Sequence, residues 1–331
     1  MGTLKRRAAR SVLWLARKNP ALKRRLGRHR MRGREQVFDG GVQISSQRYM
    51  VVAGTSGFAP PKVGIYLRGA CDLPALFAMA PLLRGRFAGT CAIYRDSIEI
   101  SGSRSDLLLQ SLSGVSGIYP NELTETIGQL RLKRHYFDPV LFQPTFEIPR
   151  RDQLETFPKS VVALSIAPDY SRVLYRHRQQ GFLVDPGGWW LNQDLGKVLT
   201  DLEVAKWFGK TFEGIGRMSV EDFYRDMGRV ISELRARAGA NVIVFNTLAM
   251  DPASQRHNYQ LMRDPEMHRR REFVVALFDL AAELSFPVID VDRVLKTNGV
   301  SQQVDFAHFN QEQYAPLAEE CHQVLRDLEV L

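Results

Sequence analysis

Short apolar runs alternate along the chain with longer stretches in which hydrophobic residues recur at helical spacing. The runs are rich in Val, Ile, Leu or Tyr, as expected of buried parallel strands. They lie at residues 63–67, 90–94, 161–166, 242–245 and 288–291. The helical stretches lie at about 72–84, 219–238, 266–285 and 310–328. This order of strand, helix and strand predicts an α/β protein with a doubly wound, flavodoxin-like parallel sheet.

Two long stretches interrupt this rhythm, at about 96–158 and 171–218. We expect extra helices and loops in both, because long insertions in open α/β folds often cover the ligand site. Residues 35–60 show the alternation of a small hairpin, or form a linker. The sequence thus predicts an arm over residues 1–34, a hairpin or linker over 35–60 and one α/β domain over 61–331.

The formal charge of +9 comes from 45 basic and 36 acidic residues, and it is unevenly distributed. Residues 1–34 contain 13 Lys or Arg and no acidic residue, which leaves 32 basic against 36 acidic residues in the rest. The body of the protein is therefore mildly acidic. Nucleic-acid binding is disfavoured, because no recognised nucleic-acid module accompanies the basic arm.

The basic arm also carries apolar residues at spacings that a helix would place roughly on one side. They are Leu4, Ala8, Val12, Leu15 and Leu22. Such a helix can lie on an anionic membrane surface, although a solvated basic tail fits the same residues equally well. No apolar run is long enough for a transmembrane helix or a signal-peptide core. We therefore expect a cytoplasmic protein, with peripheral binding at the inner face of the membrane as one option.

The three cysteines, Cys71, Cys91 and Cys321, have neither paired spacing nor a zinc pattern. A disulfide scaffold is not expected, and a reducing compartment is the default. Cys91 falls within an apolar strand and Cys321 within the last helix, so both are interpreted as packing residues. The histidines His135, His177 and His268 also lack metal-ligand spacing, and no metal site is predicted.

Cys71 follows the first strand at the sheet edge where ligands bind in parallel α/β folds. Gly69 permits a tight turn, and a helix beginning near Asp72 would present free N–H groups to the sulfur. These groups lower a thiol's pKa and can hold an oxyanion. The carboxylate of Asp72 opposes the thiolate, and Arg68 could offset it. The alternative role of Cys71 is a small buried residue in a turn.

Asp305 and His308 form an Asp-x-x-His element in the loop before the terminal helix. The predicted topology places this loop at the same sheet edge as Cys71. The spacing lets His308 face a nucleophile while Asp305 fixes its tautomer. Together the three residues supply the nucleophile, the general base and the orienting carboxylate that acyl-transfer chemistry needs.

The segment that begins Asp305-Phe-Ala-His308-Phe-Asn resembles the last conserved block of SGNH, or GDSL-type, hydrolases. The segment Gly69-Ala70-Cys71-Asp72-Leu73 sits where that superfamily has Gly-Asp-Ser-Leu. A cysteine at this turn resembles the WcbI-type capsule polysaccharide proteins, an SGNH-like branch with Gly-Asn-Cys-Gln there and a link to coenzyme A and acyl transfer. The resemblance spans about residues 62–325 and rests on these two blocks. It implies an SGNH-like fold with Cys71 as the nucleophile.

The chain departs from the superfamily pattern at the oxyanion hole. Ala167-Pro168-Asp169 follows the strand at 161–166, where the hydrolases usually have Gly-x-Asn-Asp. Asn246, after a later strand, could replace the missing amide, although a turn or cap residue is the plainer interpretation. The candidate oxyanion and substrate-binding residues are Gly69, Asp72, Asp169 and Asn246.

These observations predict acyl transfer or ester hydrolysis on a carbohydrate or cell-envelope substrate. Cys71 would attack, His308 would act as base and acid, and Asp305 would orient it. The scheme requires no cofactor, and acyl-coenzyme A is a candidate donor. The alternative is a catalytically silent SGNH-like protein that binds a ligand or serves as a membrane-tethered assembly factor. The sequence does not indicate an oligomeric state.

Overall fold

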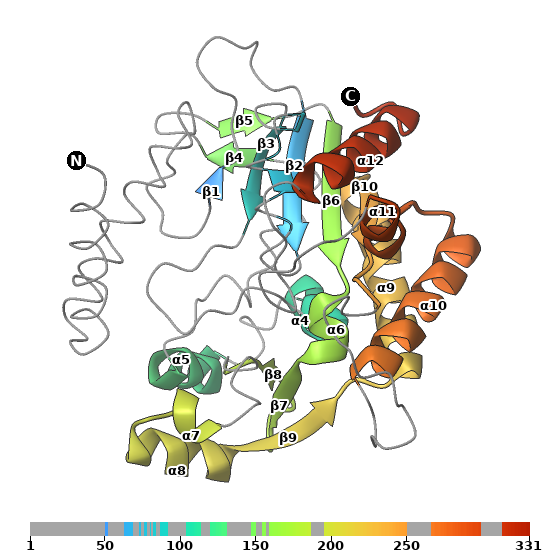
Figure 1. Cartoon of the computed structure of the whole chain (residues 1–331). Helices are drawn as coiled ribbons and strands as arrows, with labels where there is room; N and C mark the ends of the chain where they lie inside the picture. The colour runs from blue at the N-terminus through green and yellow to red at the C-terminus, as the bar shows by residue number, and fades with distance from the viewer. Residues whose placement is uncertain are drawn as a thin grey trace, which may run out of the picture.

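Figure 1 shows the computed structural model of the chain. The residues that the structure describes are 50–51, 63–68, 73, 76–77, 80, 82–83, 87–91, 104–113, 120–130, 147–149, 154–156, 159–186, 195–249, 266–298 and 313–331. The predicted arm over residues 1–34 lies outside them. Of the predicted hairpin or linker over 35–60, only Met50 and Val51 are described.

In the described part of the chain, the main sheet consists of five parallel strands and one antiparallel edge strand, in the order β1-β3-β2-β6-β10-β11. The strands are β1 (Met50–Val51), β2 (Val63–Arg68), β3 (Phe87–Cys91), β6 (Lys159–Ser165), β10 (Asn241–Phe245) and β11 (Val288–Ile289). Among the parallel strands, the first in the chain lies between the second and the third. This arrangement is the flavodoxin-like order, which confirms the predicted fold class.

The predicted strand boundaries hold closely except at two places. β3 begins at Phe87, three residues before the predicted start, because Phe87 already pairs with Val63 of β2. β11 ends at Ile289 rather than residue 291. The Asp290 side chain accepts a hydrogen bond from the Arg293 N–H and caps helix α11 (Val291–Thr297), so the last predicted strand residue starts a helix instead.

The long helices follow the prediction. They are α9 (Val220–Ala238), α10 (Glu266–Leu284) and α12 (Tyr314–Asp327). Ser219 caps α9 by accepting a hydrogen bond from the Asp222 N–H. In the predicted helix at 72–84, the described residues are helical up to Phe77, whereas Ala80 is not. The prediction was too long there because Pro81 follows, and the residue before a proline disfavours helical geometry.

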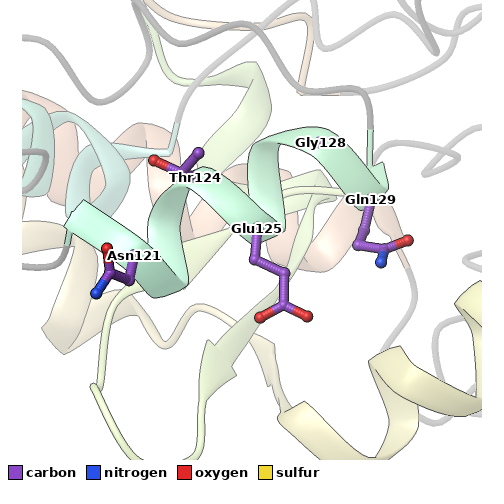
Figure 2. A pocket seen from close by; sticks show the side chains of 5 residues that line it. All are labelled: Asn121, Thr124, Glu125, Gly128 and Gln129. Carbon is purple, nitrogen blue, oxygen red and sulfur yellow. The ribbon is translucent and has the colours of Figure 1, made fainter.

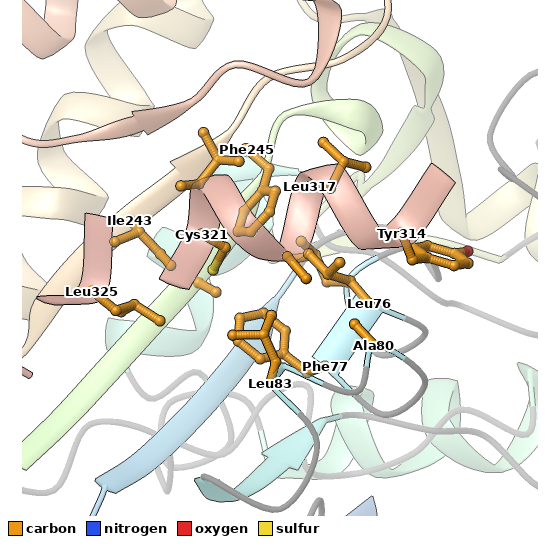
Figure 3. Packing of buried hydrophobic residues seen from close by; sticks show 14 of the residues in the cluster. Leu76, Phe77, Ala80, Leu83, Ile243, Phe245, Tyr314, Leu317, Cys321 and Leu325 are labelled. Carbon is orange, nitrogen blue, oxygen red and sulfur yellow. The ribbon is translucent and has the colours of Figure 1, made fainter. Parts of the chain in front are cut away.

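Helices cover both faces of the sheet, as its alternating core shows (Figure 1). In β6, Val162 and Leu164 pack into a cluster with α4 (Ser105–Ser113), α9 and α10. Their neighbours Val161 and Ala163 point to the opposite face, into a cluster with α11 and α12. Figure 3 shows the second face, where Leu317 and Cys321 of α12 lie over the strands. This two-sided burial is the doubly wound architecture that the sequence predicts.

The two insertions contain more strand than expected. The first holds α4, α5 (Pro120–Leu130), β4 (Glu147–Pro149) and β5 (Leu154–Thr156). The second holds β7 (Val173–His177), β8 (Leu183–Val184), α7 (Leu195–Val198), α8 (Leu202–Thr211) and β9 (Phe212–Arg217). The strands β8, β7 and β9 form an antiparallel sheet in that order. Both insertions thus contain the expected helices, and the strands are an addition that the sequence did not predict.

No helix in the described part of the chain is long and apolar enough to span a membrane.

Candidate active site

The carboxyl edge of the main sheet is where β2 ends at Arg68 and β6 ends at Ser165. The helix α12 runs antiparallel to β2, so that its first residue, Tyr314, lies toward this edge (Figures 1 and 3). Leu73, which follows β2, is buried in the same cluster as Tyr314. The two segments that flank the predicted triad therefore approach the same edge of the sheet.

The predicted triad itself, Cys71, His308 and Asp305, lies outside the described residues, as do Gly69 and Asp72. Their roles remain predictions.

Asp169 is one of the candidate oxyanion and substrate-binding residues, and it follows the end of the central strand β6. It lies in the first turn of helix α6 (Ala167–Ser171) and is fully buried. One carboxylate oxygen accepts a 2.7 Å hydrogen bond from the Ser105 backbone N–H, whereas Oδ2 has no partner. Burial raises the pKa of Asp169 to about 7, against the lowering effect of the bonds to Ser105. Near neutral pH this carboxyl group can therefore hold or release a proton.

Asn246 is the other described candidate, and it is buried just after β10. Its Nδ2 donates to Asp290 Oδ1 at 2.8 Å, and its Oδ1 accepts from the Asp292 N–H at 3.4 Å. These contacts tie the end of β10 to the start of α11. The side-chain amide thus links the two loops. Its role as an oxyanion donor remains a prediction.

Two contacts that the sequence did not reveal fix α6 at the sheet edge. The Tyr170 hydroxyl and the Thr247 hydroxyl lie 3.2 Å apart and share a hydrogen bond. Arg269 of α10 donates from Nε to the Tyr170 carbonyl at 2.8 Å. Ser105 also belongs to this group, because its N–H positions Asp169. None of these residues lies in a recognisable motif, so only the fold brings them together.

Arg68 closes β2 and is buried, at 8 % exposure. Its Nη1 donates a long hydrogen bond of 3.4 Å to the carbonyl of the preceding residue, Leu67. No carboxylate among the described residues pairs with it.

Cys321 is fully buried in α12, which confirms that it is a packing residue (Figure 3). Burial strongly raises the pKa of its thiol.

His177 accepts hydrogen bonds at Nδ1 from the N–H groups of Gln179 and Gln180, and burial lowers its pKa. His268 is exposed and lies 3.1 Å from Glu272. The described residues contain no cluster suited to a metal ion.

A hollow of about 630 Å³ lies along one side of α5, far along the chain from the predicted triad (Figure 2). Its described lining comes from this helix alone: Asn121, Thr124, Glu125, Gly128 and Gln129. Covalent acyl transfer needs a nucleophile beside a general base. The described lining of the hollow offers one carboxylate and no nucleophile with a base, so the carboxyl edge of the main sheet is the stronger candidate.

Neither a family model nor a curated protein matches the sequence. Solved structures are similar to the fold. A lipolytic G-D-S-L family protein from Veillonella parvula is 12% identical, with 80% of this chain and 98% of that chain covered and a TM-score of 0.36. An acetyl xylan esterase is 11% identical (79% and 99% covered, TM-score 0.40), and an acetylxylan esterase from Geobacillus stearothermophilus is also 11% identical (83% and 95% covered, TM-score 0.34). The strand order, rather than these distant similarities, defines the protein as a flavodoxin-like α/β protein.

Proposed function

We propose that this protein transfers or hydrolyses acyl groups at the carboxyl edge of β2, with Cys71 as the nucleophile. The observation that carries the proposal is the shared burial of Leu73 and Tyr314 in one cluster. Cys71 precedes Leu73 by two residues, and His308 precedes Tyr314 by six. An extended chain spans at most about 3.5 Å per residue, so both side chains have the reach to meet at this edge.

The reaction would run through an acyl-cysteine. His308 takes the proton of the Cys71 thiol, and the sulfur attacks the acyl carbonyl to give a tetrahedral oxyanion. The intermediate expels the leaving group, which receives the proton from His308. Water or an acceptor hydroxyl then attacks the thioester with His308 again as the base, and the thiol is restored. Asp305 would hold the imidazole in the required tautomer.

Backbone N–H groups of residues 71–73 would stabilise the oxyanion, because they would begin the helix whose later residues Leu76 and Phe77 are described as helical. Gly69 would allow the close approach of the turn. Asp72, Asp169 and Asn246 remain candidate substrate contacts.

The proposed substrate is an acyl ester of a carbohydrate or cell-envelope intermediate. Two of the similar structures are acetylxylan esterases, which by name act on acylated carbohydrate. A thiol nucleophile also suits exchange with a thioester, so we include acyl-coenzyme A as a donor and the WcbI-type branch as the related group. The scheme uses only side chains and requires no cofactor.

We further propose that residues 1–34 hold the protein at the cytoplasmic face of the membrane. The 13 basic residues of this arm would be attracted to anionic lipid. Deletion of residues 1–34 should abolish cosedimentation with vesicles that contain phosphatidylserine and leave the α/β domain folded. Unchanged binding after the deletion would contradict the proposal.

Incubation with acetyl-coenzyme A followed by intact-mass measurement tests the catalytic proposal. The wild type should gain one acetyl group, and Cys71→Ala should gain none. Cys321→Ala is the matched control, because this buried thiol should not contribute and the adduct should persist. His308→Ala should slow the appearance of the adduct. Absence of an adduct in the wild type, together with slow alkylation of Cys71 at neutral pH, would refute the covalent mechanism.

A further inference from the structure

Arg68 is a buried cation without a counter-charge in the described part of the chain. Only 8 % of its surface is exposed, and the one hydrogen bond that its side chain makes with the described residues is the 3.4 Å contact to the Leu67 carbonyl. A guanidinium group is always charged and carries five N–H donors. Burial of such a group is unfavourable unless carbonyls, a carboxylate or a ligand use its donors. Arg68 therefore keeps N–H donors that a ligand can use.

The other buried arginines in the described chain make more or stronger contacts than Arg68. Arg104 makes a bidentate contact with Asp106 and donates to two carbonyl groups. Arg172 pairs with Asp185. Arg269 donates to two backbone carbonyls, and Arg270 donates to the Leu248 carbonyl and lies over the Tyr170 ring. Arg269 and Arg270 thus use carbonyl acceptors, and Arg68 differs from all four because its side chain makes a single long hydrogen bond with the described residues.

The position of Arg68 is the place where a flavodoxin-like sheet binds its ligand. The chain leaves β2 for β3 on one side and later returns to β6 on the other, so the carboxyl end of β2 is the topological switch point. Arg68 is the last residue of β2 and pairs in register with Leu164 of β6. Leu67 is buried in the α12 cluster, so strand alternation directs Arg68 to the opposite face, where α4 packs.

We propose that Arg68 binds an anionic group, a phosphate or a carboxylate, of a ligand held at this switch point. The planar fork of a guanidinium matches both groups in a bidentate manner. The link to catalysis rests on the proposed function, because Arg68 lies three residues before Cys71. Anion binding itself does not depend on catalysis, and it can be tested separately.

Calorimetric titration of the full chain with inorganic phosphate, and in parallel with succinate, is the direct test. One of these anions should bind the wild type, and Arg68→Gln should weaken its affinity roughly ten- to hundredfold, as loss of a charged hydrogen-bond donor implies. Arg68→Lys keeps the charge but lacks the planar guanidinium fork, so its anion affinity should lie between those of the wild type and Arg68→Gln. Arg178→Gln is the matched control, because Arg178 is 49% exposed and pairs with Glu213. Equal affinity in the wild type and Arg68→Gln would overturn the proposal.

The internal alternative is Asp72, which lies outside the described residues and could neutralise Arg68 itself. If neither anion binds the wild type but phosphate binds Asp72→Asn, Arg68 is satisfied within the chain and the proposal fails. Binding of neither anion to either form also overturns it. Circular dichroism checks the fold of each variant, and Arg68→Lys carries the test if Arg68→Gln is unfolded.

A pair of thioesters connects the anion site to the reaction. Acetyl-coenzyme A carries phosphates, whereas acetyl-pantetheine offers the same thioester without them. Arg68→Gln should lower kcat/KM for acetyl-coenzyme A roughly tenfold or more relative to acetyl-pantetheine if phosphate is the bound group. If phosphate binds the wild type but Arg68→Gln lowers kcat/KM equally for both thioesters, the role of Arg68 in binding the phosphate of the substrate is contradicted. If the wild type turns over neither thioester, the proposed function fails, and the titration still decides whether Arg68 binds an anion.

Discussion

The backbone N–H of Ser105 donates a 2.7 Å hydrogen bond to Asp169, whose second carboxylate oxygen is buried without a partner. Ser105 begins α4 and Asp169 lies in the first turn of α6, so the contact joins two elements beside the central strand. Arg104 and Asp106 also act on Asp169 through their charges, with opposite signs. Burial outweighs all of these influences and raises the pKa of Asp169 to about 7.

This raised pKa predicts that the protein loses stability as the pH rises from about 4 to about 7. In that window the folded state keeps the proton on Asp169 and the unfolded state releases it, so each pH unit costs about 1.4 kcal/mol. The total loss in the free energy of unfolding from Asp169 is about 4 kcal/mol, and it stays constant at pH values above the folded pKa. Asp169→Asn retains an acceptor for the Ser105 N–H and cannot ionise, so it should remove this slope.

Urea denaturation of the wild type and Asp169→Asn at several pH values between 4 and 8 measures the effect. The pH dependence of the free energy of unfolding must be compared between the wild type and Asp169→Asn. His177 contributes a pH dependence of the opposite sign in an overlapping range. Burial lowers the pKa of His177, so its contribution is lost as the pH falls through the ordinary value of 6.5 toward the lower folded pKa. Parallel pH profiles of the two proteins would contradict the assignment to Asp169.

The main sheet could be predicted from sequence because its strands are buried on both faces and appear as continuous apolar runs. The antiparallel sheet of β7, β8 and β9 has no such signal. β9 reads Phe-Glu-Gly-Ile-Gly-Arg, and its two glycines disfavour a strand. Gly216 has φ +74° beside a register shift between β7 and β9, so the irregular backbone needs glycine where sequence patterns indicate a loop.

The candidate site could be predicted only where potential catalytic residues lie close together in the sequence. The Asp305 and His308 pair is visible as a short motif. The contact between Ser105 and Asp169 spans 64 residues and has no local signature. The lack of a carboxylate partner for Arg68 among the described residues likewise depends on the folded structure, and neither spacing nor residue type reveals it.

The buried ion pair between Arg172 and Asp185 predicts a large effect when one partner is removed. Their side chains are 2% and 3% exposed. Asp185→Leu should destabilise the protein by about 3 to 5 kcal/mol, because it leaves a buried guanidinium without its carboxylate. The double variant Arg172→Met with Asp185→Leu should recover more than half of that loss.

Denaturation midpoints of the single and double variants provide the measurement. The exposed pair of Arg178 and Glu213, 3.4 Å apart, is the control. Glu213→Gln should change stability by less than about 1 kcal/mol. A double variant as unstable as Asp185→Leu would show that the cost comes from lost packing instead of an unpaired charge.

Two glycines predict opposite responses to alanine. Gly239 ends α9 in the left-handed region, with φ 54°, so Gly239→Ala should cost about 1 kcal/mol. Gly209 lies inside α8, and an added Cβ would meet nothing within 4 Å. Gly209→Ala should therefore stabilise the protein by about 0.5 to 1 kcal/mol. Thermal unfolding measures both, and changes of the same sign would contradict this account of the helix ends and interiors.

The environment of Cys321 predicts that the native protein protects this thiol from alkylation. The residue is 0% exposed, and burial raises its pKa, so almost none of it is thiolate at neutral pH. Iodoacetamide should modify Cys321 only after denaturation, as peptide mass analysis would show. Cys71 should instead react in the native state if it is the proposed nucleophile. Native labelling that persists in Cys71→Ala and disappears in Cys321→Ala would reverse these assignments.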